Sequence, residues 1–549
     1  GYNAGTSMTD GGNATLIGFE AGKAMQGNDL TAVGFKAGTA TTAASNTFIG
    51  VNAGLINAGG DSNIGIGKDA YDNADAENHN LAIGRNALGG AVAGGEYNVA
   101  VGNYSLDALT SGDLNTALGY NSGTSLTTGV RNVIIGGDAA RNVAQGSSMV
   151  IIGDNALGTG VATGSENVII GRNAGEDLTS AVESCYVGYE SGLNATTGNG
   201  NTVLGAHAVG AGVLTGSNNV VIGKLAGNDM TSAASNVLIG EDAGANLTTG
   251  VSNVVVGQGA GEALTSPERA IFIGQNAGNG HDTENDNIGI GYEALGGSVA
   301  GGEYNVAIGN LTLDALTSGD NNIAIGYNAG SQLTSSSLNT IVGDAAGYTL
   351  TTGDGRNTII GKDCFNGTLT TGNNNIALGE RCKVSTAAAN FQFVIGSNLT
   401  SNGNSTTTIG YDTTEIATAH GSASWAAVSD QRYKKDIEDS TAGLAFIDDL
   451  RPVTFKFKQK NELATDIYGY DADSTDTDGY TDEVAHGFIA QEIKAVLDNH
   501  PEIKAGQEIW KQGTDEKSNR QSVSHIGMIP MLVKAIQELS AKVKALEEA

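Results

Sequence analysis

The feature that most constrains this chain is a repeat of about 17 residues that fills its first 410 positions. A short apolar segment ending in glycine recurs 24 times between Gly18 and Gly410. Apart from a last interval of 14 residues, every interval is 16 to 18 residues. A unit this short offers too few apolar side chains to bury a core alone, so copies must stack and cover one another. The repeat therefore predicts a β-roll or β-helix, with one coil per copy.

The copy from Asn236 to Gly250 illustrates the unit. Its apolar segment alternates with period two, which places Val237 and Ile239 on one face of a strand. Gly240 then permits a backbone turn that a Cβ atom would disfavour. Three residues after this glycine, 16 of the 24 copies have Ala and seven more have Ser, Thr or Cys, with Leu399 the exception. A position kept this small predicts close packing at a corner or axis of the stack.

Asparagine stands four residues before the glycine in 17 of the 24 copies. Stacked coils would bring these side chains to ~4.8 Å from one another, the spacing of a hydrogen-bonded amide ladder. A simpler interpretation, that asparagine only begins a strand after a turn, is also compatible with the pattern.

Composition excludes several functions. The net charge is −31 with no basic cluster, which argues against a nucleic-acid surface. No apolar run reaches the ~20 residues of a membrane span, so we expect no membrane segment. The three cysteines are too few for a disulfide framework. Cys364 and Cys382 occupy the small position of adjacent copies, where we expect stacked, buried, free thiols.

The repeat resembles the Asn-Thr-x-x-Gly-x-x-Ala units of phage tail fibres and, more loosely, the left-handed β-roll heads of trimeric autotransporter adhesins. The resemblance implies a homotrimeric fibre shaft, while periodicity alone leaves a monomeric solenoid open and does not fix the handedness. At ~4.8 Å per coil, 24 coils make a rod of roughly 115 Å. Gly-Gly-Glu-Tyr-Asn-Val occurs at 94–99 and again at 301–306, a shift of twelve coils that indicates lengthening by duplication.

From residue 429 onward the composition changes, since only 7 of the 82 glycines lie there. Residues 429–437 read Ser-Asp-Gln-Arg-Tyr-Lys-Lys-Asp-Ile, residues 450–457 predict a turn into a strand, and residues 486–493 lead into a helix. The chain ends on a heptad seam typical of a coiled coil, although one face of an ordinary amphipathic helix would look similar. The seam consists of Leu532, Ile536, Leu539, Val543 and Leu546.

These segments, in this order, resemble the C-terminal intramolecular chaperone of phage endosialidases and tail fibres. In that family the domain trimerises, templates the folding of a β-structured fibre and then cuts itself off. The resemblance implies cleavage between Val428 and Ser429, carried out by Ser429 and Lys434. Asp430, Arg432 and Asp436 complete the matching motif.

The residues are suited to this chemistry. Serine becomes a nucleophile when a base takes its proton, and a lysine can be that base if burial or nearby charge lowers its pKa. The alternatives are an ordinary surface Ser–Lys pair, or Lys435 in place of Lys434. His486 is a further candidate for proton transfer, or else a packed structural histidine. Any enzymatic activity would be a single-turnover self-cleavage without an external substrate.

An acidic run at 471–483 faintly resembles a calcium loop, with Asp476, Asp478 and Asp482 at spaced positions. It lacks the bidentate Glu of an EF-hand, so we favour a solvated insertion and expect no metal site and no cofactor.

We thus expect a shaft over 1–410, a tip or linker over 411–428 and a chaperone domain over 429–549. If the chaperone leaves, the new distal end is about 380–428, and its aromatic residues Phe391, Phe393, Tyr411 and Trp425 are candidates for surface contact or for capping the stack. The predicted function is attachment to a host glycan or protein receptor by a tail fibre, joined to other tail proteins and located on a virion or extracellular surface. The alternatives are a bacterial surface adhesin and a glycan-degrading tailspike, although the latter needs paired carboxylates in a cleft. An ice-binding solenoid is disfavoured because no Thr-x-Thr ladder recurs.

Overall fold

The computed structural model divides the chain into two compact units, Gly1–Val428 and Ser429–Ala549. Within them the structure describes residues 1–9, 12–298, 301–422, 426–427, 431, 435–463, 472, 484–501, 503, 509–512 and 521–549.

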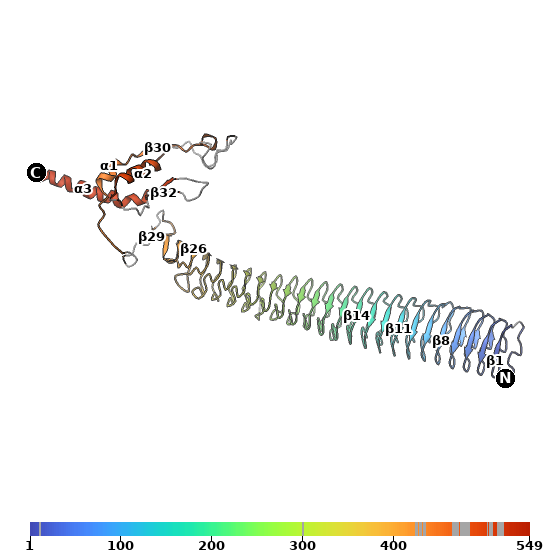
Figure 1. Ribbon diagram of the computed structural model, residues 1–549. Coiled ribbons are helices and arrows are strands. Elements are labelled where there is room, and N and C mark those ends of the chain that lie inside the picture. Colours follow the sequence, from blue (N-terminus) through green and yellow to red (C-terminus); the bar gives the residue numbers. More distant parts are fainter. Residues whose placement is uncertain are drawn as a thin grey trace. The chain divides into compact units, whose positions relative to one another are not determined.

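The first unit is a β-solenoid, as the repeat predicts. Twenty-four short strands lie side by side in chain order (Figure 1), each paired in parallel with the next at one-coil register. In a typical step, Val237 pairs with Val254 and Ile239 with Val256. The strands of this ladder are β1 (Thr15–Ile17), β2 (Thr31–Val33), β4 (Thr47–Ile49), β6 (Ile64–Ile66), β8 (Leu81–Ile83), β9 (Val99–Val101), β10 (Thr116–Leu118), β11 (Val133–Ile135), β12 (Val150–Ile152), β13 (Val168–Ile170), β14 (Cys185–Val187), β15 (Thr202–Leu204), β16 (Val220–Ile222), β17 (Val237–Ile239), β18 (Val254–Val256), β19 (Ile271–Ile273), β20 (Ile288–Ile290), β21 (Val306–Ile308), β22 (Ile323–Ile325), β23 (Thr340–Val342), β24 (Thr358–Ile360), β25 (Ile376–Leu378), β26 (Gln392–Ser397) and β27 (Thr406–Tyr411). A small second sheet joins β3 (Ala40–Thr41), β5 (Ile56–Asn57) and β7 (Asn73–Ala74).

The core of the solenoid is built from the middle residue of each strand. In β17 this is Leu238, which is fully buried, whereas Val237 and Ile239 on the opposite face are only half-buried. The predicted alternation is therefore present, but the pair it placed together faces outward. The small position contributes the other part of the core, since Ala243 and its counterparts from Ala21 to Leu399 are fully buried.

The strand glycine is required for two reasons. Gly240 has φ of +137°, a conformation that L side chains rarely adopt. A Cβ atom there would also lie 2.4 Å from the carbonyl oxygen of Gly257 in the next coil. The corner therefore depends on glycine both for its backbone conformation and for the close approach of stacked coils.

The predicted asparagine ladder is confirmed. The buried Oδ1 of Asn236 accepts hydrogen bonds from the backbone N–H of Asn253 at 2.9 Å and from its Nδ2 at 3.0 Å. Asn236 Nδ2 donates to Asn219 Oδ1 at 3.1 Å and to the Gly250 carbonyl at 2.9 Å. The Asn236 amide thus satisfies buried groups of its own coil and of both neighbours.

The two cysteines at the small position are buried and free, as expected. They lie in adjacent coils, because the Phe365 N–H donates to the Cys382 carbonyl at 2.7 Å. Cys382 Sγ donates to the Gly396 carbonyl at 3.2 Å. The hydrogen bond with Cys382, together with burial, raises the pKa of Cys364.

The parallel ladder ends in an antiparallel cap. Strand β28 (Thr414–Ala419) folds back on β27, and β29 (Ala426–Ala427) pairs with β28. The ring of Phe393 lies 5.0 Å from that of His420. Because β28 covers the edge of the last parallel strand, it blunts an end that could pair with other chains. Phe391 and Tyr411 remain exposed, and Trp425 lies outside the described residues.

The second unit is a small α+β domain. Its elements are α1 (Leu444–Asp449), β30 (Val453–Phe455), the 3-10 turn η2 (Lys460–Glu462), β31 (Ala485–Gly487), α2 (Ala490–Asn499), β32 (Trp510–Gln512), β33 (Gln521–Val523), the turn η3 (Ile526–Met528) and α3 (Ile529–Glu547). Strands β30 with β31 and β32 with β33 form two antiparallel pairs. The helices pack over a core of Phe446, Ile493, Ile509 and Met528.

The predicted C-terminal helix is present as α3. Leu444 N–H donates to Glu538 Oε2 at 2.9 Å, which ties α1 to this helix. All five residues of the heptad seam are exposed in the single chain, from 42% for Leu532 to 79% for Leu546. The helix therefore carries an apolar stripe that its own domain leaves uncovered.

Candidate functional site

Most of the residues assigned to self-cleavage lie outside the part of the chain that the structure describes. This applies to Val428, Ser429, Asp430, Arg432 and Lys434. The two described members of the set are Asp436, which is exposed with φ of +52°, and His486. The geometry of the Ser429–Lys434 pair accordingly remains a prediction.

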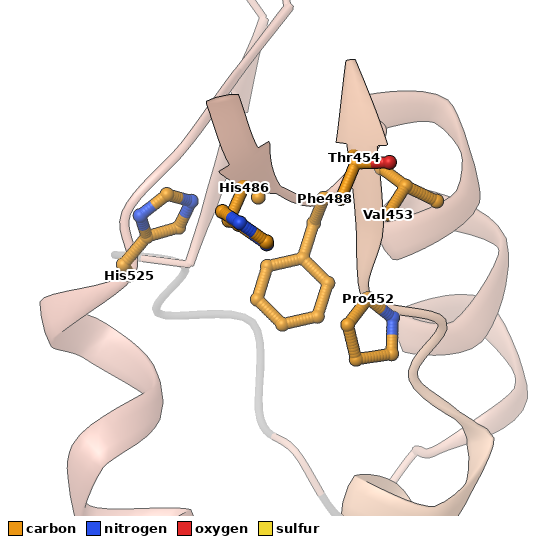
Figure 2. A pocket seen from close by; sticks show the side chains of 7 residues that line it. Pro452, Val453, Thr454, His486, Phe488 and His525 are labelled. Atoms are coloured by element: carbon orange, nitrogen blue, oxygen red, sulfur yellow. The ribbon is translucent and has the colours of Figure 1, made fainter. Parts of the chain in front are cut away.

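His486 lies on β31 and faces a pocket rather than a packed core. Strand β31 pairs with β30, so that His486 stands opposite Thr454. Its side chain is exposed. The alternative interpretation of His486 as a packed structural histidine is therefore wrong. The pocket is open, has a volume of about 560 Å³ and is shown in Figure 2. It is lined by Pro452, Val453, Thr454, His486, Gly487, Phe488 and His525.

His525 is a second imidazole at this pocket that the sequence did not reveal. It lies between β33 and η3, and its ring centroid is 5.8 Å from that of Phe488 in a T-shaped arrangement (Figure 2). An adjoining, more apolar hollow of about 250 Å³ shares Pro452, Phe488 and His525, and extends to Leu532 on α3. No local spacing connects His486 with His525, because only the fold brings β31 and the start of α3 together.

An ion pair and a histidine–carboxylate contact connect the elements around the pocket. Arg451, just before β30, makes a bidentate pair with Glu492 of α2, with Nε at 2.9 Å from Oε2. This hydrogen-bonded guanidinium lowers the pKa of Glu492. At the other end of α2, His500 Nε2 lies 2.8 Å from Asp449 Oδ2 of α1, and its ring packs against Phe446. Strand β30 and helices α1 and α2 are thus connected by polar contacts.

The two imidazoles at the pocket are candidate proton-transfer groups. Imidazole nitrogens can donate and accept protons, so the two side chains are chemically suited to assist acid–base chemistry. Within the described ranges, no group of three or more His, Cys, Asp or Glu side chains is arranged to hold a metal ion. The acidic run that resembles a calcium loop lies outside those ranges, apart from Ala472.

Comparison with known families identifies the start of the second unit. Residues 429–500 match the model of a family described as "Chaperone of endosialidase". The match begins at Ser429 and includes α1, β30, β31 and α2. The search of curated proteins found no match.

The chain therefore combines a β-solenoid shaft with a domain similar to the endosialidase chaperones, an architecture of the tail-fibre or tailspike type. Among the described residues, no helix has the length and apolar character needed to cross a membrane.

Proposed function

We propose that this protein is the shaft of a homotrimeric attachment fibre, assembled by its C-terminal chaperone domain and then released from it by cleavage before Ser429. The observation that carries the proposal is the position of the family match. It begins at Ser429, the first residue of the second compact unit and the residue that follows the end of the solenoid unit.

The shaft itself supplies the reason for a chaperone. Twenty-four coils of nearly the same sequence offer many registers, because a chain shifted by one coil still pairs similar residues. A domain that first joins three chains would fix their register before the shafts form. The exposed seam of α3 is suited to this step, since heptad stripes associate into coiled coils.

The proposed cleavage needs only groups of the chain and a water molecule. The Ser429 Oγ attacks the carbonyl carbon of Val428 while the Lys434 amine takes the hydroxyl proton. The Val428–Ser429 peptide bond breaks as that proton passes to the leaving amino group of Ser429, which leaves an ester. Water then hydrolyses the ester, and the shaft ends in the Val428 carboxylate. His486 is a candidate to assist one of these proton transfers.

Once the chaperone has left, the distal end of the fibre is the antiparallel cap of β27 and β28. We place receptor contact there, at the exposed aromatic rings of Phe391 and Tyr411, with a surface glycan or protein as the partner. The same build would serve a bacterial surface adhesin, whose heads the repeat also resembles. A virion-borne tail fibre is the proposal we favour because the chaperone match belongs to endosialidases.

Mass spectrometry of four purified chains tests the cleavage. The parent should yield fragments of 428 and 121 residues, whereas Ser429→Ala and Lys434→Ala should each keep an intact chain of about 55 kDa. Lys435→Ala is the matched control and should be cleaved like the parent. An intact parent chain in correctly folded protein would refute self-cleavage, and cleavage of Lys434→Ala with loss in Lys435→Ala would assign the base to Lys435.

A further inference from the structure

The outer face of the main sheet carries an apolar surface that the single chain leaves uncovered. Two positions in each coil point outward, one and three residues before the strand glycine. The first is Ile, Val or Leu in all 24 coils, and the second is Val, Ile, Leu, Thr, Cys or Phe in all 24. Neither column contains a charged or amide side chain, although the chain carries a net charge of −31. We call these two columns the outer stripe.

None of the residues in the outer stripe is buried, whereas the strand centres between them are buried in every coil except the first, where Leu16 is half-buried. Large aliphatic side chains of the stripe are exposed, by 59% at Ile17, 47% at Leu118, 45% at Leu204 and 39% at Ile325. If two such side chains leave on the order of 100 Å² per coil, the stripe offers roughly 2,400 Å² per chain. A standard stable interface takes about 800 Å² from each partner, and the largest apolar patch of an ordinary monomer is about 300–600 Å².

The columns that flank the stripe are mixed: they hold charged side chains in some coils and apolar ones, such as Phe35 and Leu338, in others. On one side, Lys224 and Glu241 of adjacent coils form an ion pair of 3.1 Å. On the other, Arg269 Nε lies 2.7 Å from Asp286 Oδ1 in the next coil. In these coils the apolar centre has a charged rim, which is the anatomy of a protein–protein interface.

We propose that the outer stripe is the contact between copies of this chain in the assembled fibre. A partner must present an apolar face of the same length and the same axial repeat, and another copy of the shaft has both. The inference rests on the proposed multi-chain fibre. It adds that the outer stripe is the face that each shaft turns toward the centre of that fibre. The chaperone would then bring three stripes together in register.

Native Cys185 provides a probe, because it lies in the stripe on β14 and is half-buried, whereas Cys364 and Cys382 are buried inside the solenoid. The first measurement is labelling of the native fibre with a bulky maleimide. The stripe proposal predicts that Cys185 reacts at least tenfold more slowly in the assembled fibre than in dissociated but folded chains. Equal, rapid labelling of Cys185 in both would refute it.

The second measurement is sedimentation of two triple variants of the full chain. Leu118→Glu, Leu204→Glu and Ile325→Glu together place charges on the stripe at positions that are exposed in the single chain. Thr128→Glu, Thr215→Glu and Ser335→Glu together are the matched control, in exposed loops of the same coils. We expect the stripe variant to remain β-rich by circular dichroism but to lose its multi-chain shaft, while the control assembles like the parent.

Normal shaft assembly of the stripe variant would place the interface elsewhere and leave the multi-chain fibre standing. A parent that sediments as one chain would refute the fibre proposal itself. If the stripe variant fails to fold, the labelling of Cys185 in the parent still decides the question.

Discussion

Removing one amide from the asparagine ladder should open the shaft locally. In Asn236→Ala, the buried backbone N–H of Asn253 and the Gly250 carbonyl each lose the partner that Asn236 provides. A buried polar group without a partner costs ~1–3 kcal/mol, so two of them cost about 2–6 kcal/mol. We take about 3 kcal/mol as the working value. The backbone N–H of residue 236 can still donate to Asn219 Oδ1 in the variant, so the contact with the preceding coil is retained. The loss of stability should therefore centre on the following coil.

Hydrogen–deuterium exchange of the assembled fibre measures this directly. Amides of β17 and β18 bond to the neighbouring coils, as Val254 N–H does to the Ala270 carbonyl at 2.9 Å. A local loss of about 3 kcal/mol should speed their exchange roughly 100-fold. Asn246→Ala removes an exposed amide from the same coil and is the control. If the two variants exchange alike, the ladder contributes nothing to the stability of the stack.

Two further substitutions test single positions of the solenoid. His281 occupies the position that is Leu264 in the preceding coil, it is fully buried against Phe272, and neither ring nitrogen has a hydrogen-bond partner among the described residues. Burial lowers the pKa of His281 to about 3. Between about pH 6.5 and 3 the unfolded chain therefore binds a proton that the folded chain does not. The free energy of unfolding should accordingly fall by up to ~1.4 kcal/mol for each pH unit of acidification in this range. His281→Leu should raise the thermal midpoint at pH 7 and flatten this acid dependence, and an unchanged pH profile would contradict the assignment. Gly240→Ala should lower the thermal midpoint or block assembly, because its Cβ would collide with the Gly257 carbonyl. The control Gly59→Ala should be tolerated, because the Cβ there meets only ordinary contacts at 3.5 Å. Equal midpoints for the two variants would refute the requirement for glycine at the strand end.

The shaft was largely predictable because the sequence samples each position 24 times. The strand glycine, the small corner and the Asn236 ladder all follow from side chains that recur at one coil position. Which strand face forms the core did not follow, since Val237, Leu238 and Ile239 are all apolar. Alternation assigns residues to two faces but cannot say which face is inside when both are apolar.

The second unit was predictable in its elements but not in its pocket. The heptad spacing predicts α3, and residues 486–493 lead into α2, as observed. Each of these signals is local. The meeting of His486 with His525 depends on the pairing of β30 with β31 and on the packing of the following helices, which no spacing encodes.

The central claim is that the C-terminal domain is needed to assemble the shaft but not to maintain it. The most direct test compares by sedimentation two samples of residues 1–428, one released from the full chain by cleavage and one produced without residues 429–549. The released shaft should contain three chains and stay assembled after the chaperone is removed, while the shaft produced alone should be misassembled or insoluble, because its register was never fixed. Identical three-chain particles from both routes would contradict the claim.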